Sequence, residues 1–306
     1  MVNFTFMRPD NSLLTIIIPA YNEVDSLQNV LQSLIPFCED RGWEIIVVND
    51  GSKDGTKELL SAFATTENLK ILHHKLNMGY GRAIKSGIKN VTTKYCVTID
   101  ADGQHDLQDV EFMFQKMIDI DADLIVGNRK GNASLRFKRE FGKFIIRNIA
   151  KLLMPLTVYD INSGMKMYNT RLAQKYIHIC PDSMAFSDVI TLTFIYQRNF
   201  VFEIPITIKE RIAGKSKIRV RTAFETIMEI INIVTLFNPM RIFLPLSLFF
   251  IAISIIWEIP IFFRGSGLST GALLGFITGL IFFLLGLIAE QLGNLRKLAI
   301  TDTTLE

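Results

Sequence analysis

Two long apolar segments near the C-terminus constrain the fold of this chain more than any other feature. Residues 242–263 and 268–289 contain 22 residues each, and Glu258 is their only charged residue. As a helix, each segment would reach ~33 Å, enough to cross the ~30 Å hydrocarbon core of a bilayer. A short RGSG turn separates them, so the two helices should form a hairpin. We expect a transmembrane hairpin within residues 241–290; two buried core helices are the alternative.

The residues that flank the hairpin predict how it lies in a membrane. Residues 219–240 alternate basic or polar residues with Ile, Phe and Met at helical spacing, which predicts an amphipathic juxtamembrane helix. The turn of the hairpin contains Arg264, whereas many more basic residues lie before and after the hairpin. By the positive-inside rule, residues 1–218 and the tail at 291–306 should both be cytoplasmic. The flanking basic residues are Lys209, Arg211, Lys215, Lys217, Arg219, Arg221, Arg241, Arg296 and Lys297.

Within residues 1–218, strand-length apolar runs alternate with helix-length amphipathic segments. The runs are rich in β-branched residues and nearly continuous in hydrophobicity, which is typical of strands buried on both faces of a parallel sheet. The alternation predicts an open, doubly wound α/β fold, in which ligands bind at the carboxyl ends of the strands. The expected strands are residues 13–20, 44–50, 69–74, 95–100 and 123–128, and the expected helices are about 24–41, 53–66, 79–90 and 107–119.

Polar loops follow the first two expected strands. The first strand ends in PAYNE, residues 19–23, and the second in NDGSKDGT, residues 49–56. Asp50 and Ser52 can cap a helix, and Gly51 permits a tight turn, so each loop alone is a plain strand-to-helix connection. Side by side, the two loops form a crevice suited to a nucleotide, because helix N-termini and backbone N–H groups attract anions.

The stretch NMGYGRA follows the third expected strand and partly matches a dinucleotide-binding fingerprint. Gly79 and Gly81 fit the first two glycines, but Ile84 stands at the third position, and the fingerprint belongs after the first strand of its unit. Close packing of a helix, with Arg82 directed at a phosphate, is the better interpretation.

The fourth expected strand runs into an acidic cluster, VTIDADGQHD at residues 97–106. Asp100, Asp102 and Gln104 alternate there and supply two carboxylates and an amide oxygen. Such hard oxygen donors suit Mg²⁺ or Mn²⁺. An Asp at the end of a buried strand is costly unless it is paired or bound to a metal. The cluster therefore predicts a divalent metal site.

Two other interpretations of this cluster fit less well. A calcium-binding EF-hand would use Asp100, Asp102 and Glu111, but it needs Gly where His105 stands, and a helix rather than a strand before the loop. An acidic turn that caps the following helix accounts for Asp106 but not for Asp100. We interpret His105 as a solvated loop residue rather than a metal ligand.

Charge and cysteine content exclude some classes of protein. The formal net charge of +3 is too small to indicate a nucleic-acid-binding protein, although basic residues cluster at residues 129–151 and 209–221. Cys38, Cys96 and Cys180 are scattered and odd in number, without CxxC spacing. They are expected to be buried hydrophobic residues in a reducing compartment rather than metal or redox sites.

In combination, these motifs resemble the inverting nucleotide-sugar glycosyltransferases of family 2, which have the GT-A fold. PAYNE, NDGSKDGT, DADGQ and the GNR that ends at Arg129 match that family in order and spacing. Three later stretches, LRFKREFGK, DINSGMKMY and ERIAGKSKI, are similar to the polyprenyl-phosphate glycosyltransferases, the group that includes dolichol-phosphate mannosyltransferase. The resemblance covers about residues 13–220 and makes residues 1–218 a GT-A catalytic domain.

The resemblance implies roles for individual residues. The implied metal ligands are Asp100, Asp102 and Gln104. The residues implied to bind the nucleotide are Pro19, Ala20, Tyr21, Glu23, Asp50 and Asp100. The residues implied to bind phosphate groups of the donor or the lipid acceptor are Arg129, Arg139, Lys143, Arg211 and Lys215. The implied catalytic set is Asp102, Arg129, Arg139 and Arg211. Asn49 departs from the family, because many members have a second Asp there, and this leaves the base preference open.

The resemblance further implies transfer of one sugar from a UDP- or GDP-sugar to dolichyl or undecaprenyl phosphate, with Mg²⁺ or Mn²⁺. A lipid phosphate is already anionic, so no strong general base is needed, and arginines that position it matter more. Asp188 lies where relatives with hydroxyl acceptors carry a base, and here it is taken as a structural or positioning residue. The enzyme would act at the cytoplasmic face of a bacterial or archaeal inner membrane or of the ER membrane, and the sequence leaves a homo-oligomer open.

Two alternative functions remain at this point. A processive membrane polysaccharide synthase would have more membrane spans and a Q-x-x-R-W pattern, where this chain has QRNF at residues 197–200. A catalytically inactive membrane scaffold with the same fold would have no need for Asp100, Asp102, Arg129 and Arg139.

Overall fold

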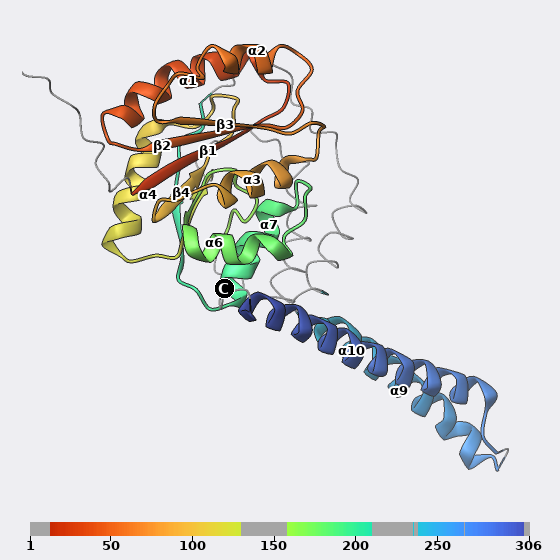
Figure 1. Cartoon of the computed structure of the whole chain (residues 1–306). Helices are drawn as coiled ribbons and strands as arrows, with labels where there is room; N and C mark the ends of the chain where they lie inside the picture. The colour runs from red at the N-terminus through yellow and green to blue at the C-terminus, as the bar shows by residue number, and fades with distance from the viewer. Residues whose placement is uncertain (1–12, 130–157, 210–234, 236–237, 266, 303–306) are drawn as a thin grey trace, which may run out of the picture. The chain divides into compact units, whose positions relative to one another are not determined.

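The computed structural model describes residues 13–129, 158–209, 235, 238–265 and 267–302, with side chains up to Leu295 (Figure 1). The chain divides into two compact units, one of residues 1–136 and 156–218 and the other of residues 137–155 and 219–306. Most of the amphipathic helix predicted at residues 219–240 lies outside the described residues.

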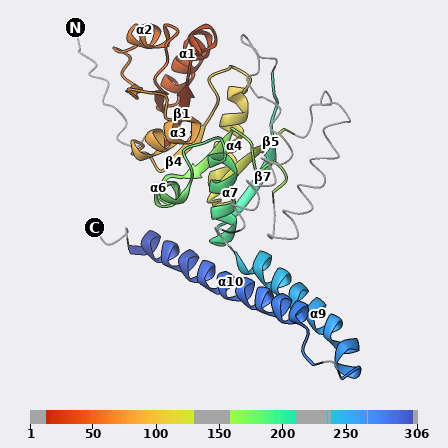
Figure 2. The same ribbon diagram turned by 90° about the vertical axis from the view of Figure 1, so that its right-hand side faces the viewer.

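The first unit is built on a seven-stranded sheet of order β3-β2-β1-β4-β6-β5-β7. Strands β1 to β4 are parallel, as predicted, and β5 pairs in parallel with β7 at the edge of the sheet (Figure 2). Strand β6 runs antiparallel to both of its neighbours, β4 and β5. The strands are β1 (Leu14–Ala20), β2 (Glu44–Asn49), β3 (Leu69–His73), β4 (Tyr95–Thr98), β5 (Leu124–Asn128), β6 (Lys166–Asn169) and β7 (Val201–Pro205).

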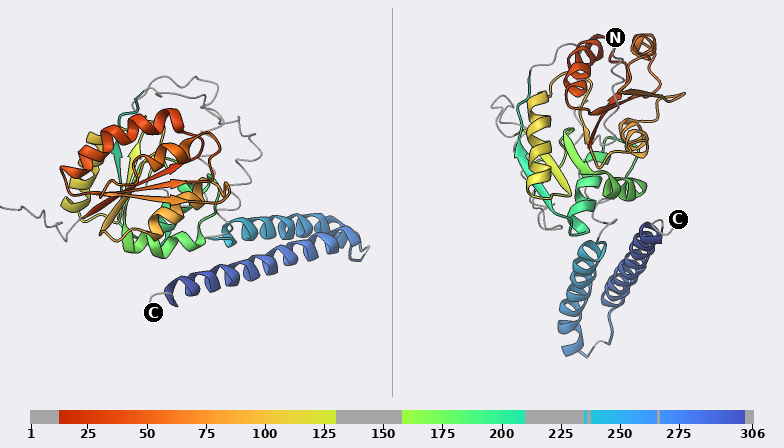
Figure 3. Two further views of the ribbon diagram at one scale, coloured as in Figure 1. Left: turned by 45° about the horizontal axis from the view of Figure 1, so that its top comes forward. Right: turned by 60° about the vertical axis from the view of Figure 1, so that its left-hand side comes forward.

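The five strands predicted from apolar runs are all present, each within two residues of its expected ends. Helices cover both faces of the sheet (Figure 3). Helices α1 and α4 lie against one face, and α3, α6 and α7 pack together on the other. The helices are α1 (Val24–Glu39), α2 (Thr56–Ser61), α3 (Tyr80–Lys89), α4 (Leu107–Asp119), α6 (Thr170–Tyr176) and α7 (Phe186–Tyr196), with a 3₁₀ turn, η2 (Ile177–Ile179), after α6.

Helix α2 is shorter than the segment predicted at residues 53–66. The Asp54 carboxylate accepts hydrogen bonds from the backbone N–H and the hydroxyl of Thr56, at 3.1 and 2.5 Å. Gly55, at φ 93°, then turns the chain into the helix. A local hydrogen bond between a side chain and the backbone, like the one from the Thr56 N–H to Asp54, competes with helical hydrogen bonding, so the helix begins at Thr56 rather than at residue 53.

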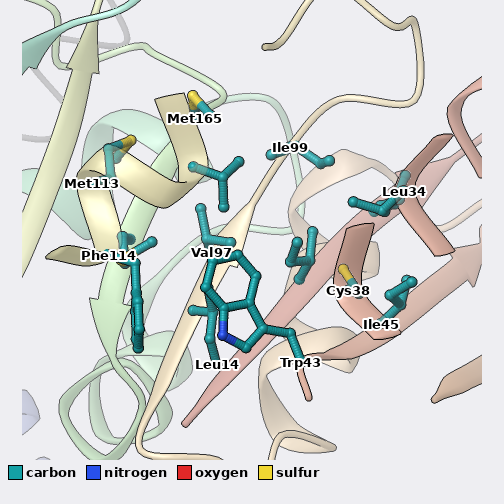
Figure 4. Packing of buried hydrophobic residues seen from close by; sticks show 14 of the residues in the cluster. Leu14, Leu34, Cys38, Trp43, Ile45, Val97, Ile99, Met113, Phe114 and Met165 are labelled. Carbon is teal, nitrogen blue, oxygen red and sulfur yellow. The ribbon is translucent and has the colours of Figure 1, made fainter. Parts of the chain in front are cut away.

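A hydrophobic core lies between the sheet and helices α1 and α4 (Figure 4). Leu14 and Val97 face it from β1 and β4, because alternate residues of a strand point to the same side. Trp43 packs edge-on against Phe114 of α4, with ring centroids 5.1 Å apart. Cys38 of α1 is buried in the same cluster, and burial raises the pKa of its thiol to about 12.

The other two cysteines, Cys96 and Cys180, are also buried and unpaired. Burial raises the pKa of each thiol to about 12, so both remain protonated and act as small hydrophobic residues. The prediction that the three cysteines are buried is therefore confirmed.

The second unit contains a hairpin of two long helices, α9 (Met240–Phe263) and α10 (Thr270–Asp302). Both are long and apolar enough to cross a membrane, with mean hydropathy of 2.3 and 2.6. Few of their side chains are buried, unlike those of core helices. Helix α10 continues past residue 289, where we expected the membrane segment to end, because a charged residue can end an apolar segment without ending a helix.

Small residues bring α9 and α10 close together. A Cβ at Gly279 would lie 2.6 Å from Ile251 of α9, and one at Gly286 would lie 2.7 Å from Phe243. Such small residues allow close helix packing in membranes, where no hydrophobic force drives helices together. At the turn, Glu258 accepts a hydrogen bond from the Ser269 N–H at 3.1 Å, which gives this charged side chain a partner at the start of α10.

Candidate functional site

The polar loops after β1 and β2 are hydrogen-bonded to each other. The Asn22 N–H donates to Ser52 Oγ at 3.0 Å, and the Lys53 N–H donates to Asn22 Oδ1 at 2.8 Å. Asn22 adopts φ 54°, a left-handed conformation that Asn tolerates better than most residues. The Val24 N–H donates to Asp54 at 3.2 Å. The two loops therefore form one hydrogen-bonded surface beside the ends of β1 and β2.

The residues expected to contact the nucleotide base and ribose lie along this surface. Ala20 is the buried last residue of β1, Pro19 is half-buried, and the Tyr21 side chain is exposed. Glu23 precedes α1, and its carboxylate accepts a hydrogen bond from the Ser26 hydroxyl at 2.9 Å. Tyr21 thus presents an aromatic ring to solvent beside the ends of β1 and β2.

Asp50 has a structural role that the sequence analysis did not foresee. Its carboxylate accepts hydrogen bonds from the backbone N–H groups of Met78 and Gly79, at 3.0 and 2.9 Å. It also pairs with His74 Nδ1 at 2.6 Å, while Nε2 of the same ring lies 2.8 Å from the Ser86 hydroxyl. Asp50 is buried, and it holds the loop between β3 and α3 in place.

Gly79, at the end of that loop, and Gly81, in the first turn of α3, act in packing, as predicted. A Cβ at Gly79 would lie 2.6 Å from the Asp182 carbonyl, and one at Gly81 would lie 2.5 Å from the Pro181 carbonyl. Arg82, which we predicted to face a phosphate, lies 3.9 Å from the Asp182 carboxylate. The start of α3 is thereby fastened to the segment that precedes α7.

The acidic loop after β4 places Asp100 among several partners. Its carboxylate accepts a hydrogen bond from the Tyr80 hydroxyl at 3.3 Å and lies 3.4 Å from His105 Nε2. A Cβ at Gly164 would overlap this carboxylate, so the glycine makes room for it. Burial acts to raise the pKa of Asp100, but hydrogen bonds from His105 and Tyr80 and the charge of Arg129 outweigh it and lower the pKa.

The side chain of His105 is buried rather than solvated, contrary to our expectation. Its side chain is 5% exposed, and its backbone pairs with Ile208 in an isolated antiparallel bridge. The sequence pattern missed this because Ile208 lies far along the chain. His105 Nδ1 is buried and has no hydrogen-bond partner among the described residues, whereas Nε2 faces Asp100.

Asp102 and Gln104 follow in the same loop. Asp102 is buried and accepts a hydrogen bond from the Gln104 N–H at 3.1 Å. The Gln104 side-chain nitrogen donates to the Lys209 carbonyl at 3.2 Å, and Lys209 Nζ lies 2.9 Å from Asp106. The segment after β7, where the second basic cluster begins, therefore lies along the acidic loop.

These oxygen donors fit a divalent metal that also binds substrate phosphates. Among the described residues, no group of three or more His, Cys, Asp or Glu side chains is placed to hold a metal ion by itself. Mg²⁺, however, is commonly bound by one or two carboxylates together with phosphate oxygens and water. Asp100 and Asp102 can supply the two carboxylates, and the Gln104 amide oxygen can supply a third hard donor.

Arg129 follows β5 and makes a bidentate ion pair with Asp160. Its Nε and one terminal nitrogen each lie 2.8 Å from an oxygen of that carboxylate, and the guanidinium also donates to the Asn162 carbonyl at 3.1 Å. The hydrogen bond to Asp160 raises the pKa of Arg129, which stays charged. The side chain remains 44% exposed, so part of it is accessible to a phosphate.

Lys166, the first residue of β6, was not among the predicted site residues. It is fully buried, and its amino group donates to the carbonyls of Ile161 and Ser187 and to the Ser187 hydroxyl. The available signal was a lysine inside the otherwise apolar run GMKMY. Asp188 is half-buried in the first turn of α7, and its negative charge acts on Lys166.

Four other predicted phosphate-binding residues lie outside the described residues. They are Arg139, Lys143, Arg211 and Lys215.

Residues 15–186, more than half of the chain, match the family model of glycosyl transferase family 2. The chain belongs to glycosyltransferase family 2. Residues 238–295 match a second model, the GtrB C-terminal hairpin, which corresponds to α9 and most of α10. Both the predicted family and the predicted hairpin are therefore confirmed.

This family 2 glycosyltransferase is similar to enzymes that act on lipid phosphates. It is 31% identical over 189 residues to a dolichyl-phosphate beta-glucosyltransferase of Dictyostelium discoideum, covering 54% of this chain and 57% of the relative. It is 27% identical over 232 residues to an undecaprenyl-phosphate 4-deoxy-4-formamido-L-arabinose transferase of Sodalis glossinidius, covering 74% and 69%. The chain spans less than two thirds of the length of the Dictyostelium relative.

The GT-A fold is shown by solved structures. Glucosyl-3-phosphoglycerate synthase from Mycobacterium tuberculosis, crystallised with Mn²⁺, UDP-glucose and phosphoglyceric acid, superposes with a TM-score of 0.56 at 15% identity. The match covers 73% of this chain and 80% of the synthase. At this identity the likeness concerns the fold alone.

Proposed function

We propose that this protein transfers one sugar, with inversion, from a UDP- or GDP-sugar to a polyprenyl phosphate. The observation that carries this proposal is the presence, in one family 2 chain, of a GT-A unit and a hairpin apolar enough to enter a bilayer. A polyprenyl chain stays in the bilayer, so an enzyme that uses it must work at the membrane surface. Relatives named for dolichyl-phosphate and undecaprenyl-phosphate transfer support the same acceptor class.

The connected loops after β1 and β2 would bind the nucleotide, with Tyr21 beside the base. Asp50 would act by holding the adjoining loop, because its carboxylate already accepts hydrogen bonds from that loop. Asp100, Asp102 and Gln104 would hold Mg²⁺ or Mn²⁺, which neutralises the charge that grows on the diphosphate leaving group. Arg129, kept charged by Asp160, would stabilise the same developing charge.

The acceptor phosphate needs positioning more than deprotonation. Its oxygen is anionic at neutral pH, so basic side chains that orient it would contribute most. These residues would be Arg129, Arg139, Lys143, Arg211 and Lys215. Asp188 would have an electrostatic role, because its charge opposes the effect of burial on the pKa of Lys166.

The hairpin would hold the catalytic unit at the cytoplasmic face of the membrane. Support for this orientation comes from the basic residues on the catalytic side of the hairpin and from the single Arg264 in its turn.

The test uses membranes that contain the protein, incubated with radiolabelled UDP- and GDP-sugars, Mg²⁺ or Mn²⁺, and polyprenyl phosphate. We expect one donor to label the lipid extract. Asp102→Asn should lower this transfer by about 100-fold or more, because it removes a carboxylate at the leaving group. Asp106→Asn is the matched control, since Asn also caps a helix and transfer should largely persist.

Two results would contradict the proposal. Label in a long water-soluble polymer would favour a processive polysaccharide synthase. No labelled lipid from any donor, together with a cellular role that survives Asp102→Asn, would favour an inactive scaffold.

A further inference from the structure

Lys166 is an ionisable residue buried inside the sheet. It lies in β6, between β4 and β5, and none of its surface is exposed. Nζ donates to the Ile161 carbonyl at 2.8 Å, to the Ser187 carbonyl at 2.7 Å and to the Ser187 hydroxyl. An ammonium group has three protons, and each has an acceptor here.

Burial of this group opposes its charge. Desolvation lowers the pKa of Lys166 to about 7, although the negative charges of Asp188 and Asp160 act in the other direction. Burial of an amine is unfavourable unless its hydrogen bonds are made, and replacing a buried charged group with an apolar one is often neutral or stabilising. The hydrogen bonds of Lys166 therefore account for its presence better than folding stability does.

These hydrogen bonds join the segment before β6, residues 160–164, to the first turn of α7. Lys166 connects Ile161 of this segment to Ser187 of α7, and the Ser187 hydroxyl also donates to the Ser163 carbonyl at 2.7 Å. At the other end, the Thr98 hydroxyl donates to the Gly164 carbonyl at 2.8 Å. The segment is thus fixed from two sides.

The same segment supports two of the predicted site residues, the phosphate-binding Arg129 and the metal ligand Asp100. Asp160 holds the guanidinium of Arg129 at 2.8 Å, and the Asn162 carbonyl accepts a further hydrogen bond from it. Gly164 leaves room for the Asp100 carboxylate. A shift of the segment would therefore move Arg129 and crowd Asp100 at the same time.

We infer that Lys166 is a positioning residue for recognition of the donor diphosphate, acting through residues 160–164 on Arg129 and Asp100. The inference rests on the proposed function, because it takes these two residues to contact the diphosphate and its metal. Lys166 itself touches no substrate. The base and ribose, which would lie at the ends of β1 and β2, do not depend on the segment.

The test compares diphosphates with monophosphates. Binding of UDP, UMP, GDP and GMP to the full chain in detergent is measured by calorimetry with Mg²⁺ present. Lys166→Met keeps the length of the side chain and removes the amine. We expect it to weaken binding of the preferred diphosphate by about tenfold or more, as losses of residues that orient metal ligands commonly do. Binding of the matching monophosphate should not change.

Two further variants separate positioning from folding. Ser187→Ala removes the hydroxyl acceptor but keeps the carbonyl, so it should fold and show a smaller loss in the same direction. Thr193→Val is the matched control, because Thr193 is also buried in α7 but its hydroxyl bonds to Val189 within the helix. It should bind every nucleotide as the unaltered chain does.

The outcomes distinguish this inference from the proposed function. If the unaltered protein prefers a diphosphate, and Lys166→Met and Ser187→Ala show the same preference, the inference is overturned but the proposed function is not. Equal losses of monophosphate and diphosphate binding also overturn it, because they indicate general damage to the fold. Unaltered protein that binds no nucleotide overturns the proposed function, and the inference with it.

Discussion

At the scale of single residues, the site depends on buried polar groups whose partners lie far away in the sequence. Asp50 and Lys166 are both buried, and each fastens a segment that adjoins or contacts residues of the candidate site. Asp50 holds the loop between β3 and α3, which ends next to Tyr80, and Tyr80 in turn donates to Asp100. Burial and the nearby Asp100 raise the pKa of Tyr80 well above its ordinary value, so its hydroxyl stays protonated and can donate.

Replacing Asp50 should destabilise the catalytic unit. In Asp50→Ala, the Met78 and Gly79 N–H groups lose their acceptor and His74 loses its carboxylate partner. Each buried group left unsatisfied costs about 1–3 kcal/mol, so we expect the free energy of unfolding to fall by about 3 kcal/mol. Urea denaturation followed by circular dichroism measures this change. Asp25→Ala, outside this network, should have little effect, and unchanged stability in Asp50→Ala would refute the structural role.

The buried Lys166 should make stability depend on pH. Its pKa is lowered to about 7 in the folded chain, whereas the unfolded chain has the ordinary lysine value of 10.5. Between these two values the unfolded chain binds more protons, so the free energy of unfolding should rise as pH increases from 7 to 10.5. Below pH 7 this contribution is constant. Denaturation at several pH values should show a shallower rise for Lys166→Met than for the unaltered chain; parallel curves would contradict the assignment.

At the scale of elements, the hairpin is the clearest case of packing that residue size controls. Helices α9 and α10 approach closely at Gly275, Gly279 and Gly286, where a Cβ would meet atoms of the other helix. Gly271 lies on the same helix, but a Cβ there would be 3.6 Å or more from its neighbours. The two kinds of glycine provide a matched comparison within one helix.

Gly279→Leu should separate the two helices of the hairpin. Its Cβ would meet Ile251 of α9 at 2.6 Å and the Ser247 carbonyl at 3.0 Å. Overpacking of this kind commonly costs about 1–3 kcal/mol. We expect a lower melting temperature of the full chain in detergent for Gly279→Leu and little change for Gly271→Leu. Equal effects of the two substitutions would show that the close contact is not what holds the hairpin.

At the scale of the whole molecule, the chain has two compact units. The proposed reaction needs both, because a water-soluble nucleotide sugar must meet a polyprenyl phosphate that stays in the bilayer. The GT-A unit supplies polar loops at the ends of its parallel strands. The second unit supplies two apolar helices whose side chains are mostly exposed, as expected for a segment surrounded by lipid. The membrane orientation can be tested directly, since the three native cysteines are buried and should label weakly.

Leu268→Cys and Lys75→Cys should report opposite sides of the membrane. Leu268 lies in the turn of the hairpin and is 81% exposed, and Lys75 is exposed in the catalytic unit. If the catalytic unit is cytoplasmic, a membrane-impermeant maleimide added to intact cells should label Cys at 268 but not at 75. Permeabilised cells should label both. Labelling of position 75 alone in intact cells would place the catalytic unit on the outer face.

The sequence by itself determined the α/β class, five of the strands, the helical hairpin and the order of the loops that bear the candidate site. These features follow from periodicity, length and local turn chemistry, all of which act over a few residues. Strand β6 was missed because it is four residues long, begins at Lys166 and contains only two apolar residues, Met167 and Tyr168. The predicted roles of the site residues remain predictions. The structure places the charged Arg129 where it acts on Asp100, and it buries Asp102 two residues further along the same loop.

Only the tertiary structure decided how the loops support one another. The pairing of His105 with Ile208 and the ion pair of Arg129 with Asp160 join residues that are distant in the sequence. The contact of Lys166 with Ser187 does the same. Such contacts have no local signature, because any buried polar group needs a partner but its own sequence does not say which one. That a buried polar group needs a partner can be inferred from the sequence, but the fold determines which residue becomes that partner.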